Sequence, residues 1–174
     1  MRIDLAHGTD VESATREQLV RLIDRYDLSP WEFTDRVVID GTGIPHSHPV
    51  LTLHTRHRDD DTLLLSTYLH EQLHWFGSSR PDTTIELAIA ELKRRYPNPP
   101  VGFPHGADSE LSAYIHYLVC RLEYLALRDV VGLEEANRAI EFWHGDHYTS
   151  IYRTIIDDGD TIDRILREHD LLPN

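Results

Sequence analysis

The sequence predicts an α+β protein in which a small N-terminal sheet packs on a mostly helical domain. Two observations carry this prediction: short strand-like runs occur early in the chain, and hydrophobic residues recur at helical spacing from residue 62 onwards. A third is size, because 174 residues with 40% hydrophobic content can bury one sizeable core. We therefore expect residues 1–174 to form a single domain with the sheet in front and the helices behind it.

One helix and two strands are expected in the first third of the chain. Thr15 and Gln18 can form a capping box, and apolar residues follow at helical spacing, which predicts a helix over 15–27. Residues 36–40 contain a β-branched run and residues 50–54 alternate between apolar and polar, so both segments are predicted to be strands.

The remainder of the chain is predicted to be helical. A capping box of Thr83 and Glu86 and a cap at Asp108 mark two of the helix starts, and Gly132 marks one helix end. The expected helices span 62–76, 83–96, 108–131, 133–143, 148–156 and 161–169.

The amino-acid composition argues against several classes of function. The 30 acidic and 17 basic residues give a net charge of −13, which argues against binding nucleic acid or an anionic membrane through bulk charge. No apolar run approaches the roughly 18 residues of a membrane span, and no apolar signal segment opens the chain, so we expect a cytoplasmic protein. With 12 histidines and one cysteine, any transition-metal site must be built from histidine and carboxylate.

The segment His70-Glu71-Gln72-Leu73-His74 reads H-E-x-x-H and lies in a predicted helix. Residues four apart lie one above the other on a helix face, so the imidazoles of His70 and His74 can reach one metal ion. Glu71 points to a different side of the helix, where it can contact a water molecule on the metal and act as a general base.

A strand, a helix with this motif and a later helix together resemble the zincin metallopeptidases, over roughly residues 50–127. The chain also looks like a compact zincin-like group of small bacterial proteins. The resemblance implies that His70 and His74 are Zn²⁺ ligands, that Glu71 is the catalytic base and that the fold is zincin-like.

A catalytic zinc ion normally has three protein ligands. The long helix expected over 108–131 offers His116 and Glu123 on a flank with apolar neighbours, where a buried polar group needs a partner. They are seven residues apart, about 10 Å along a helix, so both are not expected to touch one ion. We take His116 as the third ligand, with Glu123 as the alternative and as an acceptor for an imidazole N–H if His116 is the ligand. Aliphatic residues mark the expected core side of this helix: Leu111, Ile115, Leu118 and Leu122.

Several other histidines have no fixed role from sequence. His46 and His48 lie in the loop between the two strands, and His54 ends the second strand, which borders the substrate cleft in zincin-like folds. His147 and Tyr148 belong to an aromatic cluster and can donate to an oxyanion.

These observations lead to the hypothesis of a zinc-dependent metallohydrolase, foremost a metallopeptidase that acts on a peptide or protein. The alternative is a catalytically silent, metal-binding zincin-like module with a structural or regulatory role. The sequence identifies neither the substrate nor the oligomeric state.

Overall fold

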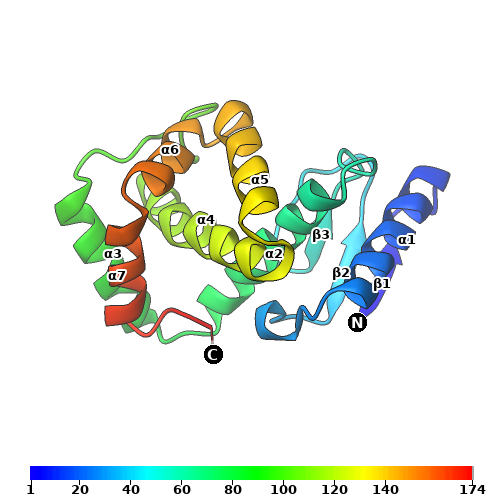
Figure 1. Ribbon diagram of the computed structural model, residues 1–174, viewed down its shortest axis with the longest axis horizontal. Helices are drawn as coiled ribbons and strands as arrows, with labels where there is room; N and C mark the ends of the chain where they lie inside the picture. The colour runs from blue at the N-terminus through cyan, green and yellow to red at the C-terminus, as the bar shows by residue number, and fades with distance from the viewer. Residues whose placement is uncertain (174) are drawn as a thin grey trace.

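The computed structural model describes residues 1–173 and confirms the α+β class (Figure 1). Within that range a three-stranded sheet precedes a largely helical remainder. The elements are β1 (Arg2–Leu5), α1 (Asp10–Arg25), a 3₁₀ turn η1 (Ser29–Trp31), β2 (Arg36–Ile39), β3 (Leu51–Leu53), α2 (Asp61–Ser78), α3 (Asp82–Arg95), α4 (Glu110–Val131), α5 (Leu133–Asp146), α6 (Thr149–Asp157) and α7 (Gly159–Glu168).

The sheet is parallel, with the strand order β1-β2-β3. Its register pairs Ile3 with Val37 and Val37 with Leu51. Strand β1 was not predicted, because its four residues include two charged ones and carry little apolar pattern. Parallel strands need a crossover, and α1 supplies it between β1 and β2. The outer edge of β3 is partly covered, since His46 and Thr52 form an antiparallel bridge.

Helix α1 begins before the predicted residue 15, so the expected capping box of Thr15 and Gln18 was wrong. The capping box consists of Thr9 and Glu12 instead. The Glu12 carboxylate also accepts the backbone N–H of Gly41 at 3.0 Å, which ties the start of α1 to the loop after β2. Thr15 and Gln18 are therefore interior helix residues, and both are buried.

Two other predicted helix starts need correction. Helix α3 follows Pro81 with no side-chain cap, so Thr83 and Glu86 do not form the expected box. Helix α4 is capped by Ser109, whose side chain accepts the backbone N–H of Ser112 at 3.1 Å, in place of the predicted Asp108. The predicted stop at Gly132 is confirmed, with φ of 88°, a conformation that glycine adopts without strain.

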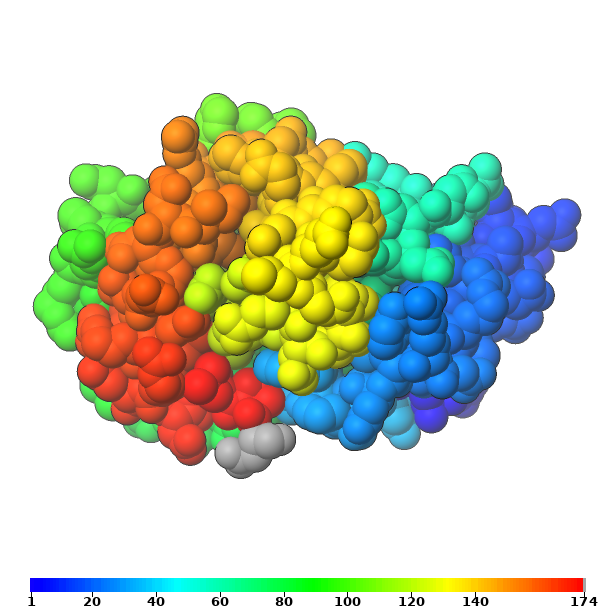
Figure 2. All heavy atoms as spheres, in the orientation of Figure 1, coloured from blue at the N-terminus to red at the C-terminus, as the bar shows by residue number. Residues whose placement is uncertain are grey.

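Helix α4 runs through the middle of the helical part and contacts α2, α3, α5, α6 and α7 (Figure 1). On the face shown in Figure 2, α5, α6 and α7 cover most of it. The expected core side was partly wrong: Leu111 is 55% exposed, whereas Tyr114, Tyr117 and Arg121 are buried. A helix with neighbours on nearly every side has no single core face. The buried charge of Arg121 is balanced by an ion pair with Asp163.

Buried apolar side chains from the sheet and the helices form one continuous cluster. Helix α2 lies between the two parts, because it contacts β3 and α1 as well as α4 and α5. The motif-bearing helix therefore lies at the centre of the fold. Over residues 1–173, no helix has the combination of length and apolar character that a membrane crossing requires.

Candidate metal centre

Helix α2 is buried over most of its length, and its apolar side chains Leu65, Leu69, Leu73 and Phe76 pack in the core. On the other side of the helix His70 and His74 lie one turn apart, with ring centroids separated by 5.0 Å. Burial of α2 on several sides places both imidazoles against α4 and away from bulk solvent. The arrangement expected from the motif spacing is therefore present.

Helix α4 brings His116 to the same place. Its ring centroid lies 5.5 Å from that of His70 and 5.1 Å from that of His74. One ring nitrogen from each of the three histidines lies within 4.8 Å of the others, a spacing that a single metal ion can bridge. His116 thus joins the two motif histidines, whereas Glu123 lies on another side of His70.

Hydrogen bonds fix the orientation of two of these rings. The Nδ1 atom of His70 lies 2.9 Å from Glu123 Oε2, and the Nδ1 atom of His116 lies 2.7 Å from the carbonyl oxygen of Ser112. Both oxygens only accept, so each Nδ1 carries the proton and donates. This leaves Nε2 of each ring as the nitrogen that is free to bind a metal.

Glu123 is fully buried and has three donors of its own. It accepts the hydroxyl of Tyr152 at 2.9 Å, the hydroxyl of Ser66 and the Nδ1–H of His70. Ser66 in turn accepts the indole N–H of Trp143 at 2.7 Å. These donors satisfy a carboxylate that would be costly to bury alone, and they hold it beside His70.

Burial sets the protonation of the histidines. It lowers the pKa of His74 to about 2, with help from the neighbouring His70 and His116 rings, and it lowers the pKa of His116 to about 3. Burial acts in the same direction on His70, but the Glu123 carboxylate, which accepts from the Nδ1–H of His70, outweighs it and holds the pKa of His70 well above its ordinary value. His74 and His116 are therefore neutral, as metal ligands must be, and a cation at His70 Nε2 would take the place of a proton.

Glu71 follows His70 in the chain and lines the cavity beside the three histidines. Glu71 is 6% exposed, and burial raises the pKa of its carboxyl to about 7. A carboxyl with such a pKa both accepts and returns a proton near neutral pH.

The cavity has a volume of about 610 Å³ and is lined by the three histidines and Glu71. Tyr148 lies on one wall, with its ring 4.4 Å from that of His116. His147 lies next to it and contacts Asp146 through Nδ1 at 3.0 Å. Asp146 also accepts a hydrogen bond from Arg56 at 2.9 Å, so this ion pair holds the carboxylate that orients the His147 ring.

The remaining histidines flagged in the sequence separate into two groups. His46 and His54 line the same cavity as the metal-binding candidates. His48 lies elsewhere: its ring stacks on Trp75 at 4.2 Å and lines a second, apolar cavity. None of the three supplies a ring nitrogen to the cluster of His70, His74 and His116.

The donor set fits zinc. A zinc ion held by three imidazole nitrogens beside a cavity would keep one coordination position open, as catalytic zinc sites do. A second group of potential ligands, formed by His70, Cys120 and Glu123, is fully buried. In that group the carboxylate is already used by three donors, and burial raises the pKa of the Cys120 thiol, so it remains protonated. The histidine cluster is therefore the better metal site.

Sequence reasoning missed four residues that support this site. Ser66 stands one helical turn before His70, and that spacing was the available signal for it. Tyr152, Asp146 and Arg56 reach the site only through the packing of α5 and α6, which no local pattern reveals. Comparison of the chain with family models, curated proteins and solved structures finds no match.

Proposed function

We propose that this protein is a zinc-dependent hydrolase that cleaves peptide bonds. The observation that carries the proposal is the convergence of His70, His74 and His116 on one point, with Glu71 beside them on the wall of a cavity of about 610 Å³. Zinc bound there would polarise a carbonyl group and lower the pKa of a water molecule. The mixed polar lining and the size of the cavity suit a segment of peptide.

In this proposal Glu71 moves the proton. Its carboxylate takes a proton from the attacking water and returns it to the nitrogen of the leaving amine. Burial raises the pKa of this carboxyl, which makes its carboxylate a stronger base for the first step.

Two neighbouring side chains have complementary roles. Burial raises the pKa of Tyr148, so its hydroxyl stays protonated and can donate to the oxygen on which negative charge develops. The Nδ1–H of His147 donates a hydrogen bond to Asp146, and burial lowers the pKa of His147. Neutral His147 therefore offers Nε2 as an acceptor for an N–H group of the substrate.

The test compares the wild-type protein with Glu71→Gln. Protein purified without an affinity tag is analysed for zinc and incubated with a mixed peptide library, and cleavage is followed by mass spectrometry. We expect one equivalent of zinc in both proteins and loss of hydrolysis in Glu71→Gln only. Glu17→Gln, an exposed change on α1, is the matched control and should behave as wild type.

A second variant tests the oxyanion donor. Tyr148→Phe removes one hydroxyl and should lower kcat about 10²–10³-fold with zinc content unchanged. Hydrolysis retained in Glu71→Gln would overturn the proposed chemistry. One equivalent of zinc without cleavage of any peptide would instead support the alternative of a silent metal-binding module.

A further inference from the structure

A second cavity adjoins the candidate metal centre, and we propose that it holds a large apolar side chain of the substrate beside the scissile bond. We further propose that two carboxylates at its edge favour a basic residue next to that side chain. This inference rests on the proposed function and names the peptides that the same site selects.

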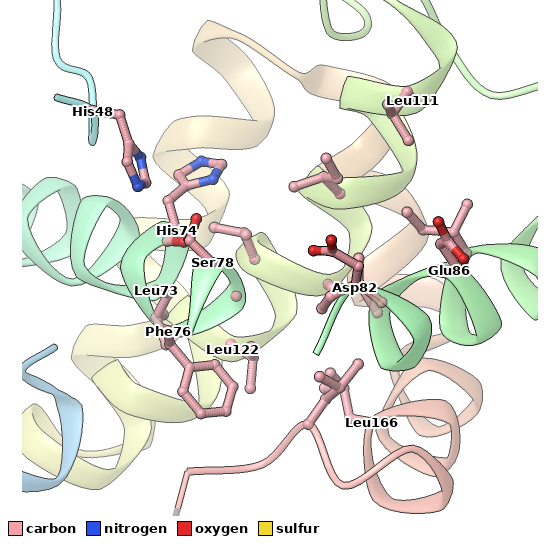
Figure 3. Close-up of a pocket in the computed structure, with 17 residues that line it drawn as sticks. His48, Leu73, His74, Phe76, Ser78, Asp82, Glu86, Leu111, Leu122 and Leu166 are labelled. Carbon is pink, nitrogen blue, oxygen red and sulfur yellow. The ribbon is translucent and has the colours of Figure 1, made fainter. Parts of the chain in front are cut away.

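The second cavity has a volume of about 420 Å³. Figure 3 shows its wall, with His48 and His74 at one end and Leu111 and Glu86 at the other. Most of the lining is aliphatic or aromatic and comes from α2, α3, α4, α7 and the segment after α7. The lining residues include Leu73, Phe76, Ile89, Ile115, Leu122 and Leu166. Such a surface excludes water and gains free energy from an apolar occupant.

The two cavities share a wall at the candidate metal centre. His74 lines both of them, so a group in the apolar cavity touches one of the proposed zinc ligands. The loop before β3 also spans both: His46 and Ser47 line the polar cavity, and His48 lines the apolar one. The indole N–H of Trp75 donates to the carbonyl oxygen of Ser47 at 2.8 Å and fixes this loop. A peptide whose carbonyl lies at the metal can therefore place an adjacent side chain in the apolar cavity.

Two carboxylates at the far side of the apolar cavity are placed to bind the substrate residue next to that apolar side chain. Asp82 and Glu86, one turn apart on α3, are exposed and line the cavity, and the Asp82 carboxylate points into it (Figure 3). Neither carboxylate forms an ion pair with another group in residues 1–173. The nearby Arg80 instead lies over the Phe76 ring at 4.3 Å. Both carboxylates thus remain available for a cation of the substrate.

The experiment measures cleavage and binding of matched peptides. One series places Leu, Phe, Ala or Asp at each position beside a common cleavage site, and a second varies the next residue between Arg and Gln. We expect kcat/KM to be at least tenfold higher with Leu or Phe than with Ala on one side of the cleaved bond. A preference of several-fold for Arg over Gln should weaken as salt concentration rises.

Variants assign the preferences to the cavity. Leu111→Trp, at a 55% exposed residue, should reduce the preference for Leu and Phe, and the double variant Asp82→Asn with Glu86→Gln should remove the preference for Arg. Leu87→Trp is the control, because Leu87 is 59% exposed on the same helix as Asp82 and does not line the cavity. Binding of the Leu and Ala peptides to Glu71→Gln protein, measured by calorimetry, gives a readout that does not need turnover and should show the same order.

The outcomes separate the two proposals. Cleavage with no apolar preference, or a preference that Leu111→Trp leaves unchanged, would overturn the assignment of the apolar cavity and leave the hydrolase proposal standing. An Arg preference that survives the double variant would overturn the role of the two carboxylates. Zinc-loaded protein that cleaves no peptide would overturn the proposed function and, with it, this inference.

Discussion

Replacing Glu123 with Gln tests how the candidate metal centre is built. The Gln side chain has the same shape, and its oxygen can still accept from His70 and Tyr152, while its NH₂ group faces the hydroxyl of Ser66. The change removes the negative charge that makes the His70 ring a stronger electron donor. Loss of such a partner typically lowers metal affinity about 10–100-fold, or about 1.4–2.7 kcal/mol of binding free energy.

The affinity is measured by titrating zinc into metal-free protein in competition with a chromophoric chelator at pH 7. Circular dichroism of the metal-free variant checks that the fold is kept. Glu110→Gln, an exposed change in the first turn of the same helix, is the control and should bind zinc as the wild type does. An affinity for Glu123→Gln equal to that of wild type would refute the idea that Glu123 supports a zinc ligand through His70.

Three predictions concern stability. Burial lowers the pKa of His57 to about 4, so His57 stays neutral in the folded state, whereas in the unfolded state it takes up a proton below pH 6.5. The free energy of unfolding should therefore fall by about 3 kcal/mol between pH 6.5 and 4. In urea titrations, His57→Phe should flatten this dependence on pH. Asp163→Asn leaves the buried Arg121 without its partner at 2.7 Å and should cost about 3 kcal/mol in the same assay. Gln72→Leu removes the acceptor of two backbone N–H groups before β2, at 2.7 and 2.9 Å, and should lower stability by about 2–4 kcal/mol by thermal denaturation without changing zinc stoichiometry.

Helices were predictable from this sequence where hydrophobic residues recur with a regular period, and their starts were less so. The position of α2 was found to within two residues at each end, because its apolar stripe is continuous. The start of α1 was missed, since Thr9 and Thr15 are each followed after three residues by a possible capping partner. Local pattern cannot decide between such alternatives; the decision comes from the contact that Glu12 makes with Gly41, far along the chain.

For the candidate site, the spacing of residues within α2 predicted which histidines lie together, but the sequence did not show the contacts between helices. The positions of His70 and His74 follow from helical geometry alone. The choice between His116 and Glu123 as third ligand depended on which side of α4 faces α2. Because α4 is buried on most sides, its hydrophobic pattern does not show which side that is. The structure brings His116 to the other two histidines and Glu123 to the far nitrogen of His70.

The three histidines are not held equally, and this difference connects the two cavities. His70 and His116 are each fixed by a hydrogen bond at Nδ1, so their orientation is set when the protein folds. His74 is one turn further along α2, where it forms the wall shared by the polar and apolar cavities. A side chain that enters the apolar cavity packs against this ring and limits its rotamers. In the proposed enzyme, filling the apolar cavity would therefore order the least constrained ligand, which joins recognition of the substrate to the geometry of the metal centre.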